Sequence, residues 1–313
     1  MYYPYFRGKL YELITIRETA RLLASAGFVP IIEPVKESLG GLEKTLNALC
    51  GVGGKAIIIV NPSCGDHCNG GNGISQFLQD LFLGDYNISP GILLHSNMSF
   101  NEAVEIYNLH KDFNPICIHA GFPEPKSFSA FLGNDIDNSK HVFIDEHARI
   151  LYRKHFQGSM RILVHDGFKR QRNADYPPLE EFSDLHVTFG EMNMTGFGDF
   201  LIVGDNYSES GGPAYAVAIH LTFIDRDKDD MMYIYHFVSD TRDTPTDPAG
   251  KFAQALKKLI DKLDSGESKL LETTAIKEFR ELHAKGHFPG LGYVKKLSMK
   301  HHIETLEDYL VEL

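Results

Sequence analysis

The sequence predicts an α/β fold, a TIM-barrel-like (β/α)8 arrangement with an irregular last quarter and a C-terminal helical elaboration. Short apolar runs alternate with segments of helical periodicity, as in sheets whose parallel strands are joined by helices. Most of these runs end in a polar or ionisable residue, the kind of side chain that barrels gather at the carboxyl ends of their strands. The run Ala56–Val60 is so apolar that it is typical of a parallel strand buried on both faces.

The first half of the chain predicts six strand–helix units. Gly27 ends the first helix at a position that favours glycine, and Ser99 with Glu102 forms a capping-box pattern at the start of another. The expected helices are Tyr11–Ala26, Leu39–Leu49, Ile74–Leu83 and Ser99–His110, and Lys126–Phe131 is expected to be a helix or an irregular turn. The expected strands and their polar ends are Phe28–Ile32 with Glu33, Ala56–Val60 with Asn61, Gly91–Leu94 with His95, Pro115–Ile118 with His119, Val142–Ile144 with Asp145, and Ile162–Val164 with His165 and Asp166.

The second half is less regular. Met231–Val238 should pair with the preceding strand as an antiparallel hairpin, because a charged turn separates them. Further strands are expected at Phe200–Val203 and Tyr215–Phe223, and helices at Pro248–Leu263, Thr274–Ala284 and Ile303–Leu310. We expect a single domain over residues 1–313, with residues 248–313 as its helical elaboration. A doubly wound sheet would fit the first six units equally well. We favour the barrel, because polar residues end every strand and do not cluster at one switch point, as they would in a doubly wound sheet.

Composition narrows the class of protein. The chain has 313 residues, 43% of them hydrophobic, which is enough for a sizeable core. Its formal charge of -11 argues against broad, non-specific binding to nucleic acid or to an anionic membrane. It contains no apolar run of the length of a bilayer span, and Met1–Leu10 does not resemble a signal peptide. Four cysteines do not make a disulfide framework. We therefore expect a cytoplasmic protein that does not bind membranes.

The strand ends supply the candidate site. Carboxylates and imidazoles that converge at a barrel mouth can act as general acid and base, or bind a metal ion. The alternative interpretation is that a polar residue follows each strand only because a solvent-exposed loop begins there. Three histidines at strand ends are unusual for such loops. The candidate catalytic residues are His119, Asp145, His165 and Asp166, and the candidate ligand-binding residues at these ends are Glu33, Asn61 and His95.

Two loops add candidate ligand-binding residues. Arg170 and Arg172 follow the sixth strand, and clustered guanidinium groups suit a phosphate or carboxylate through bidentate hydrogen bonds. A solvated loop in which they pair with nearby acids is an equally good interpretation. Glu209 lies in a turn rich in acceptors and glycines that could shape a pocket or simply connect two strands.

The sequence specifies no cofactor and no metal. Cys64, His67 and Cys68 share one glycine-rich loop, but no second ligand pair at a supporting spacing accompanies them. The glycines of the loop match neither a Walker A sequence nor GxGxxG, although they precede a helix that could hold a phosphate.

Several stretches along the chain resemble the phage beta-protein family, and most closely an uncharacterised bacterial branch of it. They are Tyr2-Tyr3-Pro4-Tyr5-Phe6-Arg7-Gly8-Lys9 with Glu12, Pro30-Ile31-Ile32-Glu33-Pro34, Asn173-Ala174-Asp175-Tyr176-Pro177, Phe182-Ser183-Asp184-Leu185-His186, Gly196-Phe197-Gly198-Asp199-Phe200, Tyr207-Ser208-Glu209-Ser210-Gly211-Gly212-Pro213, His287-Phe288-Pro289-Gly290-Leu291-Gly292 and Ser298-Met299-Lys300-His301-His302-Ile303-Glu304. The resemblance implies a TIM-barrel-like fold and an accessory or anti-phage context. It supplies no reaction and no catalytic residues.

Two functions remain open from the sequence. The first is a barrel hydrolase or lyase whose polar mouth binds a small anionic ligand that is phosphorylated or nucleotide-like. The second is a non-enzymatic binding or sensor subunit that acts with a partner protein. For either, the basic segment His287–His302 is expected to be irregular and to dock a second copy or a neighbouring-gene protein, because opposite charges orient a complex.

Overall fold

The computed structural model describes residues 1–68, 70, 72–82, 87–209 and 212–311. By its internal contacts the chain divides into two compact units. The first is Met1–Asp166 with Thr188–Phe200, and the second is Gly167–Val187 with Leu201–Leu313. The helices expected within residues 248–313 belong to the second unit, because they pack on its own sheet.

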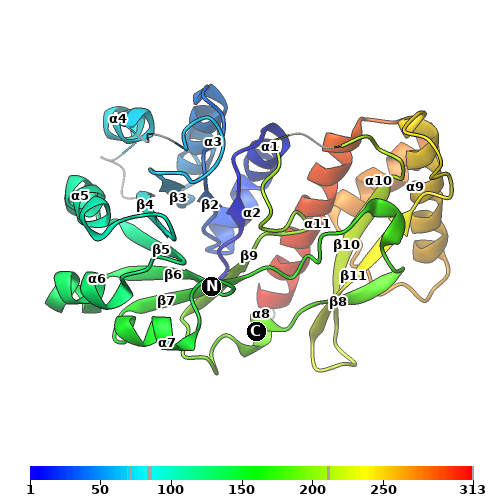
Figure 1. Ribbon diagram of the computed structural model, residues 1–313. Helices are drawn as coiled ribbons and strands as arrows, with labels where there is room; N and C mark the ends of the chain where they lie inside the picture. The colour runs from blue at the N-terminus through cyan, green and yellow to red at the C-terminus, as the bar shows by residue number, and fades with distance from the viewer. Residues whose placement is uncertain (69, 71, 83–86, 210–211, 312–313) are drawn as a thin grey trace. The chain divides into compact units, whose positions relative to one another are not determined.

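The first unit is a barrel of parallel strands with helices outside it (Figure 1). A parallel bridge between Tyr2 and Phe197 joins the last strand to the first, so the sheet closes on itself. This confirms the expected (β/α)8-type fold. In sheet order the eight strands are β1 (Tyr5–Phe6), β2 (Ile31–Ile32), β3 (Ala56–Ile59), β4 (Ile88–His95), β5 (Ile116–Ala120), β6 (Lys140–Ile144), β7 (Met160–His165) and β9 (Gly196–Asp199).

The helices of the first unit lie close to their expected positions. The capping box of Ser99 and Glu102 is present: the Ser99 hydroxyl accepts from the Glu102 N–H, and the Glu102 carboxylate accepts from the Ser99 N–H. The helices are α1 (Leu10–Glu18), α2 (Ala20–Ser25), α3 (Gly40–Cys50), α4 (Asn72–Leu81), α5 (Phe100–His110), α6 (Pro125–Leu132) and α7 (Ile150–Arg153), the last continued by a 3-10 turn at Lys154–Phe156.

Aliphatic side chains fill the barrel interior. Alternate residues of each strand point inward, so Ile57 and Ile59 of β3 pack with Ile116 and Ile118 of β5. Phe200, directly after β9, belongs to the same cluster. The residues between them along each strand face the surrounding helices. By this alternation Glu33, Asn61 and His95 continue the inward-facing positions of their strands. His119, Asp145 and His165 continue the outward-facing ones.

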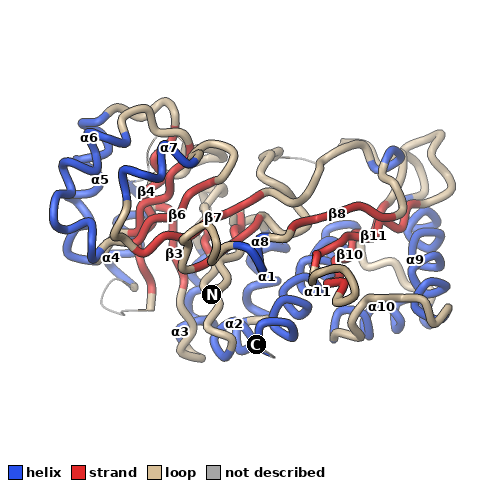
Figure 2. Tube along the Cα trace, turned by 90° about the horizontal axis from the view of Figure 1, so that it is seen from below, coloured by secondary structure: helices blue, strands red, loops and turns tan. Residues whose placement is uncertain are grey.

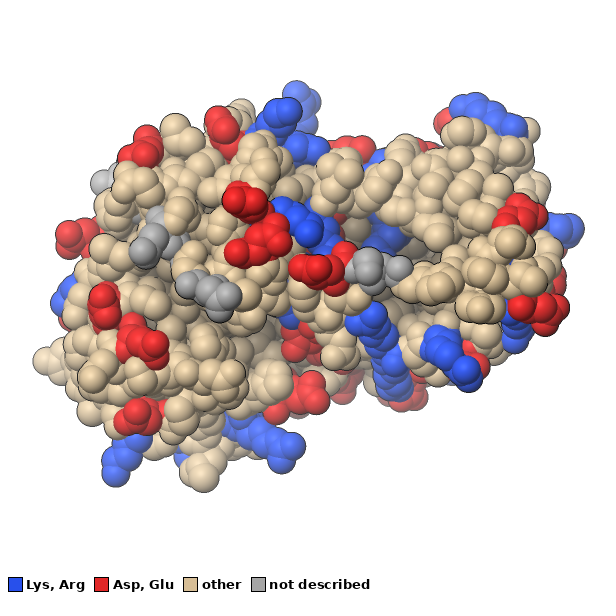
Figure 3. Space-filling view, turned by 45° about the horizontal axis from the view of Figure 1, so that its top comes forward, with Lys and Arg blue, Asp and Glu red and all other residues tan. Residues whose placement is uncertain are grey.

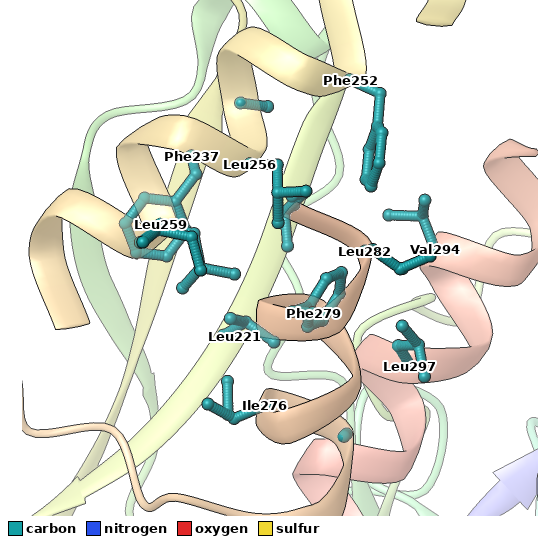
Figure 4. Close-up of a cluster of buried hydrophobic side chains, with 14 of the residues drawn as sticks. Leu221, Phe237, Phe252, Leu256, Leu259, Ile276, Phe279, Leu282, Val294 and Leu297 are labelled. Atoms are coloured by element: carbon teal, nitrogen blue, oxygen red, sulfur yellow. The ribbon is translucent and has the colours of Figure 1, made fainter. Parts of the chain in front are cut away.

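The second unit is a three-stranded antiparallel sheet covered by three helices (Figure 2). β10 (Ala218–Asp225) and β11 (Met231–Val238) form the expected hairpin, and β8 (Leu179–Ser183) pairs with the other edge of β11. Their apolar face packs against α9 (Pro248–Asp264), α10 (Thr274–Lys285) and α11 (Leu291–Val311). Figure 4 shows Leu221, Phe252, Ile276, Phe279 and Leu297 meeting in this core. A four-residue helix, α8 (Leu185–Thr188), lies between β8 and β9 in the chain.

One strand was missed and one was misplaced. The strand expected at Phe28–Ile32 is present as β2, but the barrel begins earlier, at β1. The sequence did not indicate β1, because it is only two residues long and follows a proline, which disfavours strands. Phe200–Val203 is not a strand: Leu201 has a φ of 50°, which ends the ladder there. The strand lies just before it, at Gly196–Asp199, where a Cβ on Gly198 would lie 2.1 Å from the carbonyl oxygen of Tyr3.

The carboxyl-terminal segment also differs from its prediction. His287–His302 was expected to be irregular and accessible, but α11 begins at Leu291 and Lys296, His301 and His302 are buried. The Lys296 ammonium lies 3.8 Å from the centre of the Tyr293 ring, so an aromatic face accommodates its charge. The glycines and lysines of this segment made the apolar face of the helix hard to recognise in the sequence. The helix packs in the core of the second unit.

Some expectations fall outside the described residues: Leu83 as a helix end, Asn69 and Gly71 of the glycine-rich loop, and Ser210 and Gly211 of the turn near Glu209. None of the helices in the described chain is long and apolar enough to cross a bilayer. On the face drawn in Figure 3, the basic and acidic side chains of the described residues are interspersed.

Candidate site at the carboxyl ends of the barrel strands

The strand ends carry the polar residues that the sequence predicted there. Glu33 directly follows β2, His95 ends β4, Asp145 directly follows β6, and His165 ends β7. Asn61 lies two residues beyond β3. These five residues therefore lie at the ends of their strands, as expected. Their contacts divide them into separate groups.

Asp145, His165 and Asp199 form a row across three neighbouring strands. The Asp145 N–H donates to the carbonyl of Val164 at 2.9 Å, which places Asp145 beside His165. His165 is in turn the register partner of Asp199 on β9. The Nδ1 of His165 donates to Asp145 Oδ2 at 3.3 Å, and Arg153 of α7 donates from Nη1 to Asp145 Oδ1 at 3.2 Å. The row therefore holds one imidazole between two carboxylates.

The electrostatics of the row favour a protonated imidazole. The hydrogen bond to Asp145 raises the pKa of His165 above its usual value, and the charges of Asp145, Asp166 and Asp199 act in the same direction, against the effect of burial. The hydrogen bond from His165 and the charge of Arg153 lower the pKa of Asp145 in spite of burial. The side chains of His165 and Asp145 are 44% and 35% exposed, so a small molecule can reach the pair.

Glu33 anchors a second polar group, and this one lies inside the mouth because Glu33 has the inward-facing parity of Ile31. Its carboxylate is fully buried and accepts hydrogen bonds from the Tyr5 hydroxyl at 2.8 Å, from the Ser63 N–H at 2.8 Å and from Arg7. The Cys64 thiol donates to the same carboxylate at 3.5 Å. The guanidinium carbon of Arg7 also lies 5.0 Å from the centre of the Tyr5 ring. Although burial alone would raise the pKa of Glu33, Arg7 and these donors hold it below its usual value.

This arrangement fixes Glu33 as the internal partner of Arg7. A carboxylate has about four lone-pair positions, and the protein's own donors engage both oxygens of Glu33. Glu33 was predicted as a ligand-binding residue. Its contacts orient Arg7 and do not test that role.

His119 does not face the mouth. It is fully buried on the outer side of β5, where its Nδ1 lies 2.8 Å from the Tyr152 hydroxyl and its Nε2 lies 2.8 Å from Nδ1 of His141. Its ring stacks on Phe143, with centroids 4.7 Å apart. Burial, and then the neighbouring His141, lower the pKa of His119 well below its usual value. His119 therefore packs between the barrel and α7, and these contacts do not test the catalytic role predicted for it.

Asn61 and His95 make local contacts at the other strand ends. The Asn61 amide exchanges two hydrogen bonds with the backbone of Leu93, at 2.8 and 2.9 Å, and so continues the pairing of β3 with β4. His95 Nδ1 accepts from the Asn97 N–H at 3.2 Å, within the turn that follows β4. These contacts are structural and do not test the ligand-binding role predicted for either residue.

Asp166 directly follows β7 in the first unit. The other three candidates belong to the second unit. Arg172 pairs with Asp175 at 2.7 Å, and Arg170 donates from Nη1 to the carbonyl of Asn206 at 2.8 Å. Glu209 is exposed. The pairing of Arg172 with Asp175 matches the solvated-loop interpretation of this segment.

Two side chains of the cysteine-containing loop, Cys64 and His67, contact other parts of the protein. Cys64 contacts Glu33, and Nε2 of His67 lies 3.0 Å from the carbonyl of Lys36. Within the described ranges, no three His, Cys, Asp or Glu side chains are grouped so that they could hold a metal ion.

Sequence reasoning missed Arg7, Arg153 and Asp199. Arg7 and Asp199 follow the same rule as the predicted residues, since each lies at the end of a barrel strand. Both strands were overlooked because they are short and contain or follow proline or glycine. Arg153 carried no signal along the chain, because it reaches Asp145 from a helix. Comparisons with family models, curated proteins and solved structures found no match.

Proposed function

We propose that the barrel is an enzyme in which His165 acts as a general acid and base on a small anionic substrate, phosphorylated or nucleotide-like, in a hydrolase or lyase reaction. The observation that carries the proposal is the hydrogen-bonded Asp145–His165 pair, half exposed at the carboxyl end of a barrel strand. TIM-barrel enzymes place their catalytic residues at this end. The position of the pair supports the proposal only by analogy with other enzymes of this fold. The hydrogen bond between Asp145 and His165 is direct support from this protein.

In this proposal each group of the pair has a role. Asp145 accepts the Nδ1–H, so Nε2 is the atom that exchanges a proton with the substrate or with water: it donates from the imidazolium and accepts once the ring is neutral. Asp145 also stabilises the imidazolium that then forms. Arg153 holds the second oxygen of Asp145 and keeps its carboxylate oriented toward His165. Because the surrounding carboxylates favour the imidazolium, His165 can attract an anion before it transfers a proton.

The first test concerns protonation and needs no substrate. The imidazole resonances of His165 should titrate above the usual histidine pKa near 6.5. In the Asp145→Asn variant this pKa should fall, because the amide no longer stabilises the imidazolium. An unshifted titration in the native protein, or an unchanged one in the variant, would refute the electrostatic basis of the proposal.

The second test concerns turnover. Phosphate monoesters, phosphodiesters and nucleotides are incubated with the full chain, and the products are separated by chromatography. For any substrate found, His165→Gln should lower kcat by about 10²–10⁴-fold. The control His283→Gln removes an exposed histidine of α10 and should leave kcat unchanged. Full turnover in His165→Gln would remove His165 from the mechanism.

A further inference from the structure

A pocket on the flank of the barrel lies apart from the mouth. It has a volume of about 630 Å³ and lies between α7 with its 3-10 turn, the start of β7 and the turn that precedes β9. Within the first unit, the described residues that lead into β9 form turns at 189–193 in place of a long covering helix. The lining residues are Ile150, Arg153, Lys154, Gln157, Arg161, Glu191, Met192, Asn193 and Met194.

The lining combines positive charge with apolar surface. Arg153, Lys154 and Arg161 contribute three cations, and Glu191 contributes one carboxylate. This excess of positive charge stands out in a chain of net charge -11. The turn is tied to β7 because Arg161 Nη2 donates to the carbonyl of Asn193 at 2.8 Å.

Ile150 and Met192 are exposed large hydrophobic residues of the same lining. Their side chains would lose contact with water if a ligand covered them, which favours a ligand with an apolar body. Methionine adapts to ligands of different shape, because its side chain is flexible and polarisable. An inorganic ion would leave this surface uncovered.

We propose that this flank pocket binds a small organic anion with an apolar body, such as a medium-chain carboxylate. The volume lies within the usual range for small-molecule sites. The anionic group would lie against Lys154 and Arg161, and the apolar body against Ile150, Met192 and Met194. A ligand of the same shape with a positive head group would meet the like charges of Lys154 and Arg161, because Arg153 is already paired with Asp145.

Arg153 joins the pocket to the strand-end row. It lines the pocket and donates to Asp145 Oδ1 at 3.2 Å. A bound anion would draw the guanidinium away from Asp145 and add its own negative charge. Both changes favour protonation of His165, which the carboxylates of Asp145, Asp166 and Asp199 already favour. This link needs no catalytic role for His165, so it and the proposed function can fail separately.

Calorimetric titration of the full chain with octanoate tests the binding, and octylammonium serves as the probe of opposite charge. Lys154→Met should weaken octanoate binding about two- to fivefold, and Glu191→Gln should strengthen it by a similar factor, as expected for single partly exposed charges. The matched control Lys44→Met removes an exposed lysine of α3 outside the pocket and should change nothing.

Absence of octanoate binding, equal binding of octylammonium, or equal affinities in Lys154→Met and Glu191→Gln would overturn the proposal. If Lys154→Met does not fold, the increase expected in Glu191→Gln decides alone. Saturating octanoate should also raise the pKa of the His165 ring measured by NMR. Binding without that rise would overturn the link through Arg153 and leave the pocket as an independent site.

Discussion

The buried pair of Arg7 and Glu33 allows a quantitative test of what holds the barrel mouth together. We consider Glu33→Gln, Arg7→Met and the double variant. Glu33 is fully buried and the Arg7 side chain is 12% exposed, so neither charge is well solvated. Glu33→Gln leaves the Arg7 charge without its counter-ion. It also turns an amide N–H₂ toward donors of Tyr5 or Ser63, which cannot accept it without rearrangement.

The expected cost follows from this burial. Removing one partner of a buried ion pair destabilises a protein by about 3–5 kcal/mol, because the other charge stays buried without a partner. Each single variant should therefore lose about that much. The double variant should lose less than the sum of the two, by about 1–3 kcal/mol, as for residues in direct contact. The control cycle uses Lys111→Met and Asp135→Asn, an exposed pair 3.2 Å apart, which should couple by about 0.5 kcal/mol or less.

Hydrogen exchange localises the effect to the barrel. The amides of Ile31 and Glu33 bond to Pro4 and Phe6 across β1 and β2, and they report opening of the mouth strands. A loss of 3–5 kcal/mol should accelerate their exchange by about a hundredfold to a few thousandfold. Urea unfolding followed by circular dichroism gives the global value, since the chain has no tryptophan. Single variants that cost less than about 1 kcal/mol, or effects that add, would refute the view that the pair acts as a buried unit.

Three further predictions concern the cores and caps. Phe279→Ala, in the fully buried centre of α10, should destabilise the second unit by about 3–5 kcal/mol in urea unfolding, and a loss below about 1 kcal/mol would contradict the assigned packing. Burial lowers the pKa of His141 to about 3, so the unfolded chain binds its proton near pH 6.5 while the folded chain does not; stability should fall as the pH drops from about 6.5 toward 3. Thermal melts of His141→Gln across that window should show a weaker pH dependence than the native protein, and an equal dependence would exclude His141 as a source. Ser99→Ala should cost about 1 kcal/mol, because it removes the hydroxyl that caps the Glu102 N–H at the start of α5, and unchanged exchange of that amide would argue against the cap.

The sequence by itself determined the barrel and much of its strand-end chemistry. Buried parallel strands and amphipathic helices leave local patterns, and these patterns need no knowledge of distant partners. The ends of β2, β4, β6 and β7 were therefore predictable, and with them the positions of Glu33, His95, Asp145 and His165. The strands that failed, β1 and β9, are short and contain or follow proline or glycine, so their local pattern is weak.

Only the tertiary structure decided which of these side chains act together. A shift of one residue turns a side chain from the interior of a barrel to its outer face, and so His119 packs under α7 while Ile118 faces inward. The partners of Glu33 and His165 lie on other strands, 26 residues away at Arg7 and 20 residues away at Asp145. Asp199 meets this row because β9 pairs with β7. Strand pairing brings these residues together. Pairing depends on closure of the whole sheet, and a local sequence pattern carries no information about that closure.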